Sequence, residues 1–120
     1  MTSEINIDRA ALQRLLDVIG GDPEDLAELL EEFEDATPKT LEKMAAAASS
    51  GDLNSLRIST HSLKSNGRDF GATALAQLCE ALENDCRDGT VDDPVVRVAA
   101  IAVELDRARS ALAIVSKEHE

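Results

Sequence analysis

The sequence predicts an all-α protein, an antiparallel up-down four-helix bundle with a short additional N-terminal helix. Hydrophobic residues make up 43% of the 120 residues and aromatic residues only 2%. The apolar set is built on Ala and Leu, whereas strands favour aromatic and β-branched residues. Apolar residues recur at steps of three and four, as in a half-buried helix. The expected helices span residues 8–19, 23–48, 53–69, 73–87 and 94–117.

The first helix is short, and we expect it to cover one end of the bundle. Gly20 and Gly21 can end it, because glycine readily takes the left-handed conformation that follows a last helical turn. Asp22 then begins the second helix as N-cap, with Pro23 as the first helical residue. The apolar stripe of this second helix comprises Leu26, Leu29, Leu30, Phe33, Thr37, Leu41, Met44 and Ala48.

The third helix follows the turn at residues 49–52, and its apolar positions alternate steps of three and four throughout. Gly67 lies inside this seam, where it permits a close helix–helix contact. The seam comprises Leu53, Leu56, Thr60, Leu63, Gly67 and Phe70.

The last two helices are separated by the turn at residues 87–90, and Asp93-Pro94 begins the fifth. The fourth helix follows Gly71. Short loops between amphipathic helices of this length are typical of an antiparallel four-helix bundle. We find no internal repeat or linker, so we expect one domain over residues 1–120. The apolar stripe of the fourth helix comprises Leu75, Leu78, Cys79, Leu82 and Cys86. The apolar stripe of the fifth helix comprises Val98, Ile101, Leu105, Ala108, Leu112 and Val115.

Charge is distributed unevenly along the chain. The net charge of −12 disfavours nucleic acid and an anionic membrane as partners, because both attract basic surfaces. Every charged residue in 22–35 is acidic, which makes this segment either a solvated helix face or a steering surface for a basic partner. Every charged residue in 53–68 is basic.

His61 lies in this basic segment, and its surroundings indicate chemistry. At about 100° per residue, Arg57, His61, Lys64 and Arg68 fall on one stripe beside the apolar seam. A neutral imidazole offers a ring nitrogen as a nucleophile. Ser65, one turn further on, leaves room for a partner's backbone. The pattern predicts an exposed histidine that briefly holds an anionic group, which Lys64 and Arg68 would neutralise.

Residues 61–72, HSLKSNGRDFGA, resemble the signature of histidine-containing phosphotransfer (HPt) domains. That signature reads His-x-Leu-Lys-Gly, then small and polar residues, then an apolar residue and Gly-Ala. The resemblance extends over effectively the whole chain, including the turn at 20–23 and the segment 33–41. Ser65 departs from it, because the family commonly has Gly there, and we expect a modest effect on docking. The matching positions are His61, Leu63, Lys64, Phe70, Gly71 and Ala72.

The resemblance implies a phosphorelay intermediate. His61 would accept a phosphoryl group from the phosphoaspartate of a receiver domain, in a response regulator or a hybrid sensor kinase, and pass it to another receiver. Lys64 would screen the phosphoryl oxygens, and Arg57, Ser65 and Arg68 would contact the partner. The receiver would supply Mg²⁺, so we expect no cofactor or metal bound by this chain. The expected structural positions of the motif are Leu63, Gly67, Phe70 and Gly71.

Other function classes find less support. The chain has no glycine-rich nucleotide loop and no zinc-ligand spacing, so we expect a phosphoryl carrier without an ATP site, not an enzyme. The alternative is a non-catalytic helical bundle in which His61 is inert and the acidic second helix binds a basic partner. We expect a monomer, because each apolar seam can be buried within one bundle. We expect it in the cytoplasm, because no membrane span or targeting segment is recognisable.

Overall fold

A computed structural model describes residues 7–118, and its helices confirm the all-α prediction. Each predicted helix is present with nearly the predicted bounds. The second helix runs two residues further than expected, to Ser50, and continues through Pro38. The helices are α1 (Arg9–Val18), α2 (Pro23–Ser50), α3 (Leu53–Asp69), α4 (Thr73–Asp88) and α5 (Pro94–Glu118).

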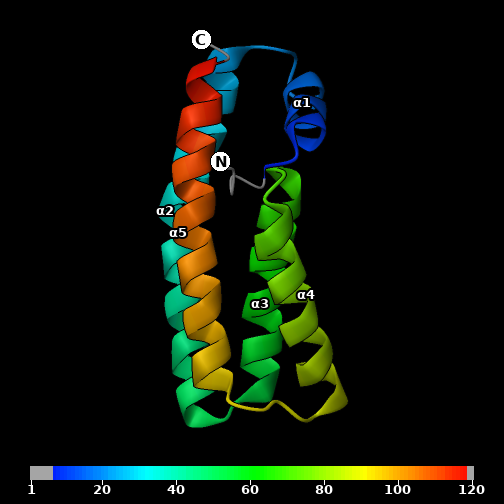
Figure 1. Ribbon diagram of the computed structural model, residues 1–120, viewed down its shortest axis with the longest axis vertical. Helices are drawn as coiled ribbons and strands as arrows, with labels where there is room; N and C mark the ends of the chain where they lie inside the picture. The colour runs from blue at the N-terminus through cyan, green and yellow to red at the C-terminus, as the bar shows by residue number, and fades with distance from the viewer. Residues whose placement is uncertain (1–6, 119–120) are drawn as a thin grey trace, which may run out of the picture.

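The four long helices pack around a shared core. Figure 1 shows α2 beside α5 and α3 beside α4, with consecutive helices running in alternating directions. Contacts join α2 to α3 and α4 to α5 as well, so each long helix touches two others. The short α1 lies at one end of the molecule, where it contacts α2 and α3. In the described part of the chain, no helix combines the length and the hydrophobicity needed to cross a membrane.

The start of α2 follows the predicted capping, and α3 begins with a cap of the same kind. The Asp22 side chain accepts a hydrogen bond from the backbone N–H of Glu24 at 2.9 Å, and Pro23 follows it as the first helical residue. Asp52 caps α3 in the same way, by accepting from the Ser55 N–H at 3.0 Å. These caps satisfy donors that a helix start otherwise leaves unpaired.

The turn between α3 and α4 anchors the N-terminal segment. The backbone N–H of Asp8 donates to the carbonyl of Gly71 at 2.7 Å. Gly71 has a φ of +76°, and a Cβ there would lie 2.4 Å from the Asp8 carbonyl oxygen. Only glycine therefore fits this close backbone contact. Asp8 also caps α1, so the Gly71 turn determines where that helix begins.

The α3 seam lies at the centre of the core. Leu56 and Leu63 are fully buried, and the ring of Phe70 packs against Phe33 with centroids 4.8 Å apart. A Cβ on Gly67 would lie 3.4–3.5 Å from Leu75 and the first turn of α4. The buried seam of α3 thus orients the rest of that helix, and the opposite face is left to solvent.

Candidate functional site

His61 lies in the middle of α3, on the side that faces solvent. Its side chain is 56% exposed, although the seam residue Leu63, two positions later, is fully buried. Helical periodicity produces this contrast, because positions two apart point in different directions around the helix. The prediction of an exposed histidine is confirmed.

One ring nitrogen of His61 contacts a buried carboxylate. Nδ1 lies 2.7 Å from Oε2 of Glu83, a residue of α4 whose side chain is only 2% exposed. An ionised carboxylate can only accept hydrogen bonds, so Nδ1 carries the proton and donates it. In the neutral ring the lone pair is then on Nε2, the nitrogen left for a partner.

Lys64 contacts the second oxygen of the same carboxylate. Its Nζ lies 2.6 Å from Glu83 Oε1, and its side chain is only 13% exposed. The prediction placed Lys64 on the same stripe as His61, where it would neutralise an anionic group held by the histidine. The structure instead directs the ammonium inward, because the long side chain reaches across to α4 and pairs with the buried acid.

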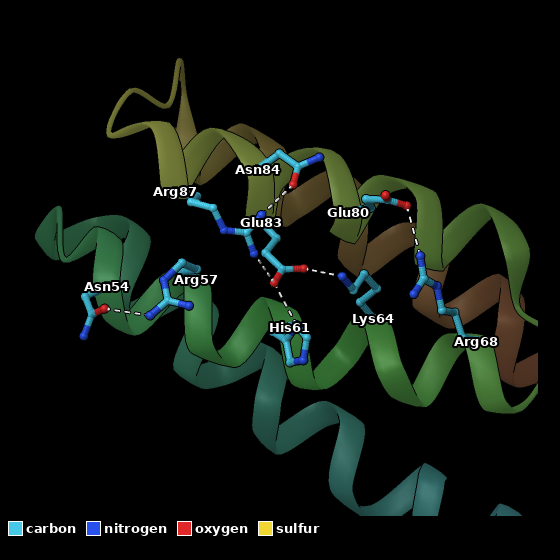
Figure 2. A network of polar contacts seen from close by, with 9 residues as sticks. All are labelled: Asn54, Arg57, His61, Lys64, Arg68, Glu80, Glu83, Asn84 and Arg87. Carbon is cyan, nitrogen blue, oxygen red and sulfur yellow. Dashed lines mark hydrogen bonds and ion pairs between the residues drawn. The ribbon is translucent and has the colours of Figure 1, made fainter.

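Arg87 completes the surroundings of Glu83. Its Nη2 lies 3.1 Å from Oε2, the oxygen that also accepts from His61, and its Nη1 donates to Asn84. Figure 2 shows the Glu83 carboxylate between His61 and Lys64 of α3, with the Arg87 side chain reaching the carboxylate from α4, the helix that also holds Glu83. Each carboxylate oxygen therefore has a charged or hydrogen-bonding partner.

These partners keep Glu83 ionised. Burial by itself would raise the pKa of the Glu83 carboxyl, but Lys64 and the hydrogen-bonded His61 ring outweigh that effect and hold the pKa below its usual value. The nearby Cys79 is affected in the opposite direction. Burial, reinforced by the Glu83 charge, raises the pKa of its thiol to about 12, so Cys79 packs as an apolar residue.

The remaining stripe residues lie on the same face of α3, where Arg57 is half-buried and Arg68 is exposed. The guanidinium of Arg57 donates to the amide oxygen of Asn54 at 3.1 Å, and Arg68 forms an ion pair of 3.2 Å with Glu80 of α4. Ser65 is exposed one turn after His61. The structural positions of the motif, Leu63, Gly67, Phe70 and Gly71, are all buried.

Sequence reasoning missed Glu83 and Arg87. Glu83 is 22 residues from His61, and nothing in the sequence around Glu83 identifies His61 as its partner. One signal was available, because Glu83 lies four residues after Cys79, on the apolar stripe of α4. A charged residue at a buried position needs a charged or hydrogen-bonding partner, so its presence on the apolar stripe predicts a polar cluster there.

The site combines an exposed nucleophilic nitrogen with a buried counter-charge. It fits the transient covalent attachment of a small electrophilic group to Nε2. Among residues 7–118, no group of three His, Cys, Asp or Glu side chains could hold a metal ion.

The comparisons with known proteins point the same way. The family model described as Hpt domain matches residues 28–111. The chain is similar to the crystal structure of histidine-containing phosphotransfer protein B (HptB) from Pseudomonas aeruginosa PAO1, with a TM-score of 0.84 and 25% sequence identity. That likeness covers 97% of this chain and 98% of the other. No match is found among curated protein sequences. The chain therefore belongs to the Hpt domain family, the histidine-containing phosphotransfer intermediates of two-component phosphorelays.

Proposed function

We propose that this chain accepts a phosphoryl group on Nε2 of His61 from the phosphoaspartate of one receiver domain and delivers it to the aspartate of another. The contact between Nδ1 and Glu83 is the observation that supports His61 most strongly. It assigns the proton to one nitrogen and leaves the other as a nucleophile on a side chain that is 56% exposed.

The transfer step balances without an added reactant. The Nε2 lone pair attacks phosphorus, the N–P bond forms, and the P–O bond to the aspartyl group breaks. The aspartate leaves as a carboxylate with the bonding electron pair. The ring keeps its Nδ1 proton and gains a positive charge, which the Glu83 carboxylate stabilises at 2.7 Å. Delivery to the next receiver reverses these bonds.

Lys64 and Arg87 position Glu83 in this proposal. A buried carboxylate without cations would tend to take up a proton and lose its charge. Lys64 at 2.6 Å and Arg87 at 3.1 Å keep the charge beside Nδ1. Phosphoryl transfer depends mainly on positioning and charge stabilisation, and this cluster contributes to both.

The remaining parts of the proposal concern the whole chain. We expect one domain over residues 1–120, an antiparallel up-down bundle with α1 as the additional helix, acting as a monomer in the cytoplasm. Receiver domains of response regulators or of a hybrid sensor kinase dock on the face around His61, where Arg57, Ser65 and Arg68 contact them. The receiver supplies Mg²⁺, and this chain binds no ATP, cofactor or metal.

The test compares the two histidines of the chain. A receiver domain is phosphorylated with acetyl phosphate and mixed with wild type, with His61→Gln or with His119→Gln, and base-stable, acid-labile phosphate is measured on this chain. We expect label on wild type and His119→Gln and none on His61→Gln. Equal labelling of His61→Gln would reject the proposal.

The interaction-bundle alternative finds no specific support at the acidic helix. Its acidic residues are mostly exposed, as in a solvated face, and one of them, Glu34, pairs with Arg109 of α5 at 3.1 Å. If His61 were inert, the buried Glu83 charge would be unfavourable for stability without assisting any reaction, since burying a charge is unfavourable.

A further inference from the structure

The cations around His61 differ in what they already bind. Lys64 and Arg87 both pair with the buried carboxylate of Glu83. Arg68 pairs with Glu80. Arg57 instead donates to the amide oxygen of Asn54, a neutral group. Of the cations on the His61 stripe and its α4 neighbour, all within the described residues, Arg57 is therefore the one whose charge no carboxylate offsets.

This difference determines which cation can move to a new anion. Lys64 could reach a phosphoryl group only by leaving a carboxylate that is 2% exposed, and a buried charge stripped of a partner is strongly destabilised. Arg57 would give up only a hydrogen bond between side chains three residues apart on a helix surface, a weak interaction.

The position of Arg57 also fits. It lies four residues before His61 on α3, and side chains at that spacing are neighbours on one helix face. Figure 2 shows Arg57 before His61 on α3, on the side away from Lys64, with its guanidinium directed toward Asn54. A guanidinium presents paired N–H donors that match the oxygens of a phosphoryl group.

We propose that Arg57 binds the phosphoryl group on Nε2 of His61, while Lys64 remains paired with Glu83. The inference rests on the proposed function of His61. It assigns the phosphoryl-binding role to Arg57 instead of Lys64. On phosphorylation the guanidinium leaves Asn54 and donates to two phosphoryl oxygens. It stabilises both the developing charge during transfer and the finished phosphohistidine.

The test uses phosphoramidate, a small phosphoryl donor, so that receiver docking cannot influence the result. Nε2 attacks its phosphorus, the N–P bond to the donor breaks, and ammonia leaves. ³¹P NMR measures the rate of phosphohistidine formation, and its lifetime after the donor is removed. The variants are Arg57→Gln and Arg57→Lys, with Arg107→Gln on α5 as the matched control. Circular dichroism checks that each variant is folded.

We expect Arg57→Gln to slow phosphorylation and shorten the phosphohistidine lifetime by about fivefold or more. Arg57→Lys should restore part of both, and Arg107→Gln should match wild type. Asn54→Ala, which frees Arg57, should not slow the reaction. Wild-type rates and lifetime in Arg57→Gln, or no rescue by Arg57→Lys, would overturn the inference. That result is separate from failure of the proposed function, which is phosphorylation of His61→Gln at the wild-type rate.

Discussion

The α3–α4 and α2–α5 helix pairs both pack Leu- and Ala-rich seams, yet they differ in how deeply the charged side chains between them are buried. Between α3 and α4 the carboxylate of Glu83 is 2% exposed and has three partners. Between α2 and α5 the ion pair of Arg109 with Glu34 lies at the surface, with the two side chains 33% and 48% exposed. Surface pairs contribute little to stability, whereas a buried carboxylate depends on every partner. Among residues 7–118, the buried charged side chain thus lies in the helix pair that holds His61.

The largest expected effect comes from removing the inward cation. Lys64→Ala takes away the partner at 2.6 Å and leaves a buried carboxylate undercompensated, so the free energy of unfolding should fall by about 3 kcal/mol. The measurement is urea unfolding followed by circular dichroism. Lys39→Ala is the matched control, because its ion pair with Asp35 is exposed and should contribute at most about 0.5 kcal/mol. Equal losses in the two variants would contradict the contrast between buried and surface pairs.

A smaller effect concerns the reaction itself. Glu83→Gln keeps an oxygen that can accept from Nδ1 but removes the negative charge, so phosphorylation of His61 by phosphoramidate should slow roughly tenfold, about 1.4 kcal/mol of barrier. Glu83→Ala loses the hydrogen bond as well and should be slower still. Glu80→Gln, on the same helix but exposed and paired with Arg68, is the control and should react as wild type does. A Glu83→Gln variant that reacts at the wild-type rate would show that the buried charge does not contribute to the rate of phosphorylation.

The smallest effect is a difference in pH dependence. The folded-state pKa of Glu83 lies below its ordinary value of 4.5, so the unfolded chain takes up a proton at higher pH than the folded chain does. The stability that Glu83 contributes is therefore present above that ordinary value and is lost as the pH falls through the folded pKa. Between neutral and acidic pH, wild type should lose more unfolding free energy than Glu83→Gln, in which this group cannot titrate. Parallel loss in the two proteins would show that the pKa of Glu83 is not lowered in the folded chain.

Most of the fold was predictable from local sequence. The Asp22-Pro23 start of α2 follows from hydrogen bonding and backbone restriction within a few residues, and it is found as expected. The burial of Leu63 and Phe70 follows from helical periodicity. The close approach of Asp8 to Gly71 was not predictable, because it joins segments more than sixty residues apart.

The candidate site was predictable only in part. The position of His61 on a helix, outside the apolar seam and among cations, was predictable, because these properties depend on a repeat of 3.6 residues. The contact of Glu83 with Nδ1 and the inward turn of Lys64 were not predictable from the sequence. Those contacts depend on the register of α4 against α3. That register comes from packing across the two seams, and no single segment of the chain contains it.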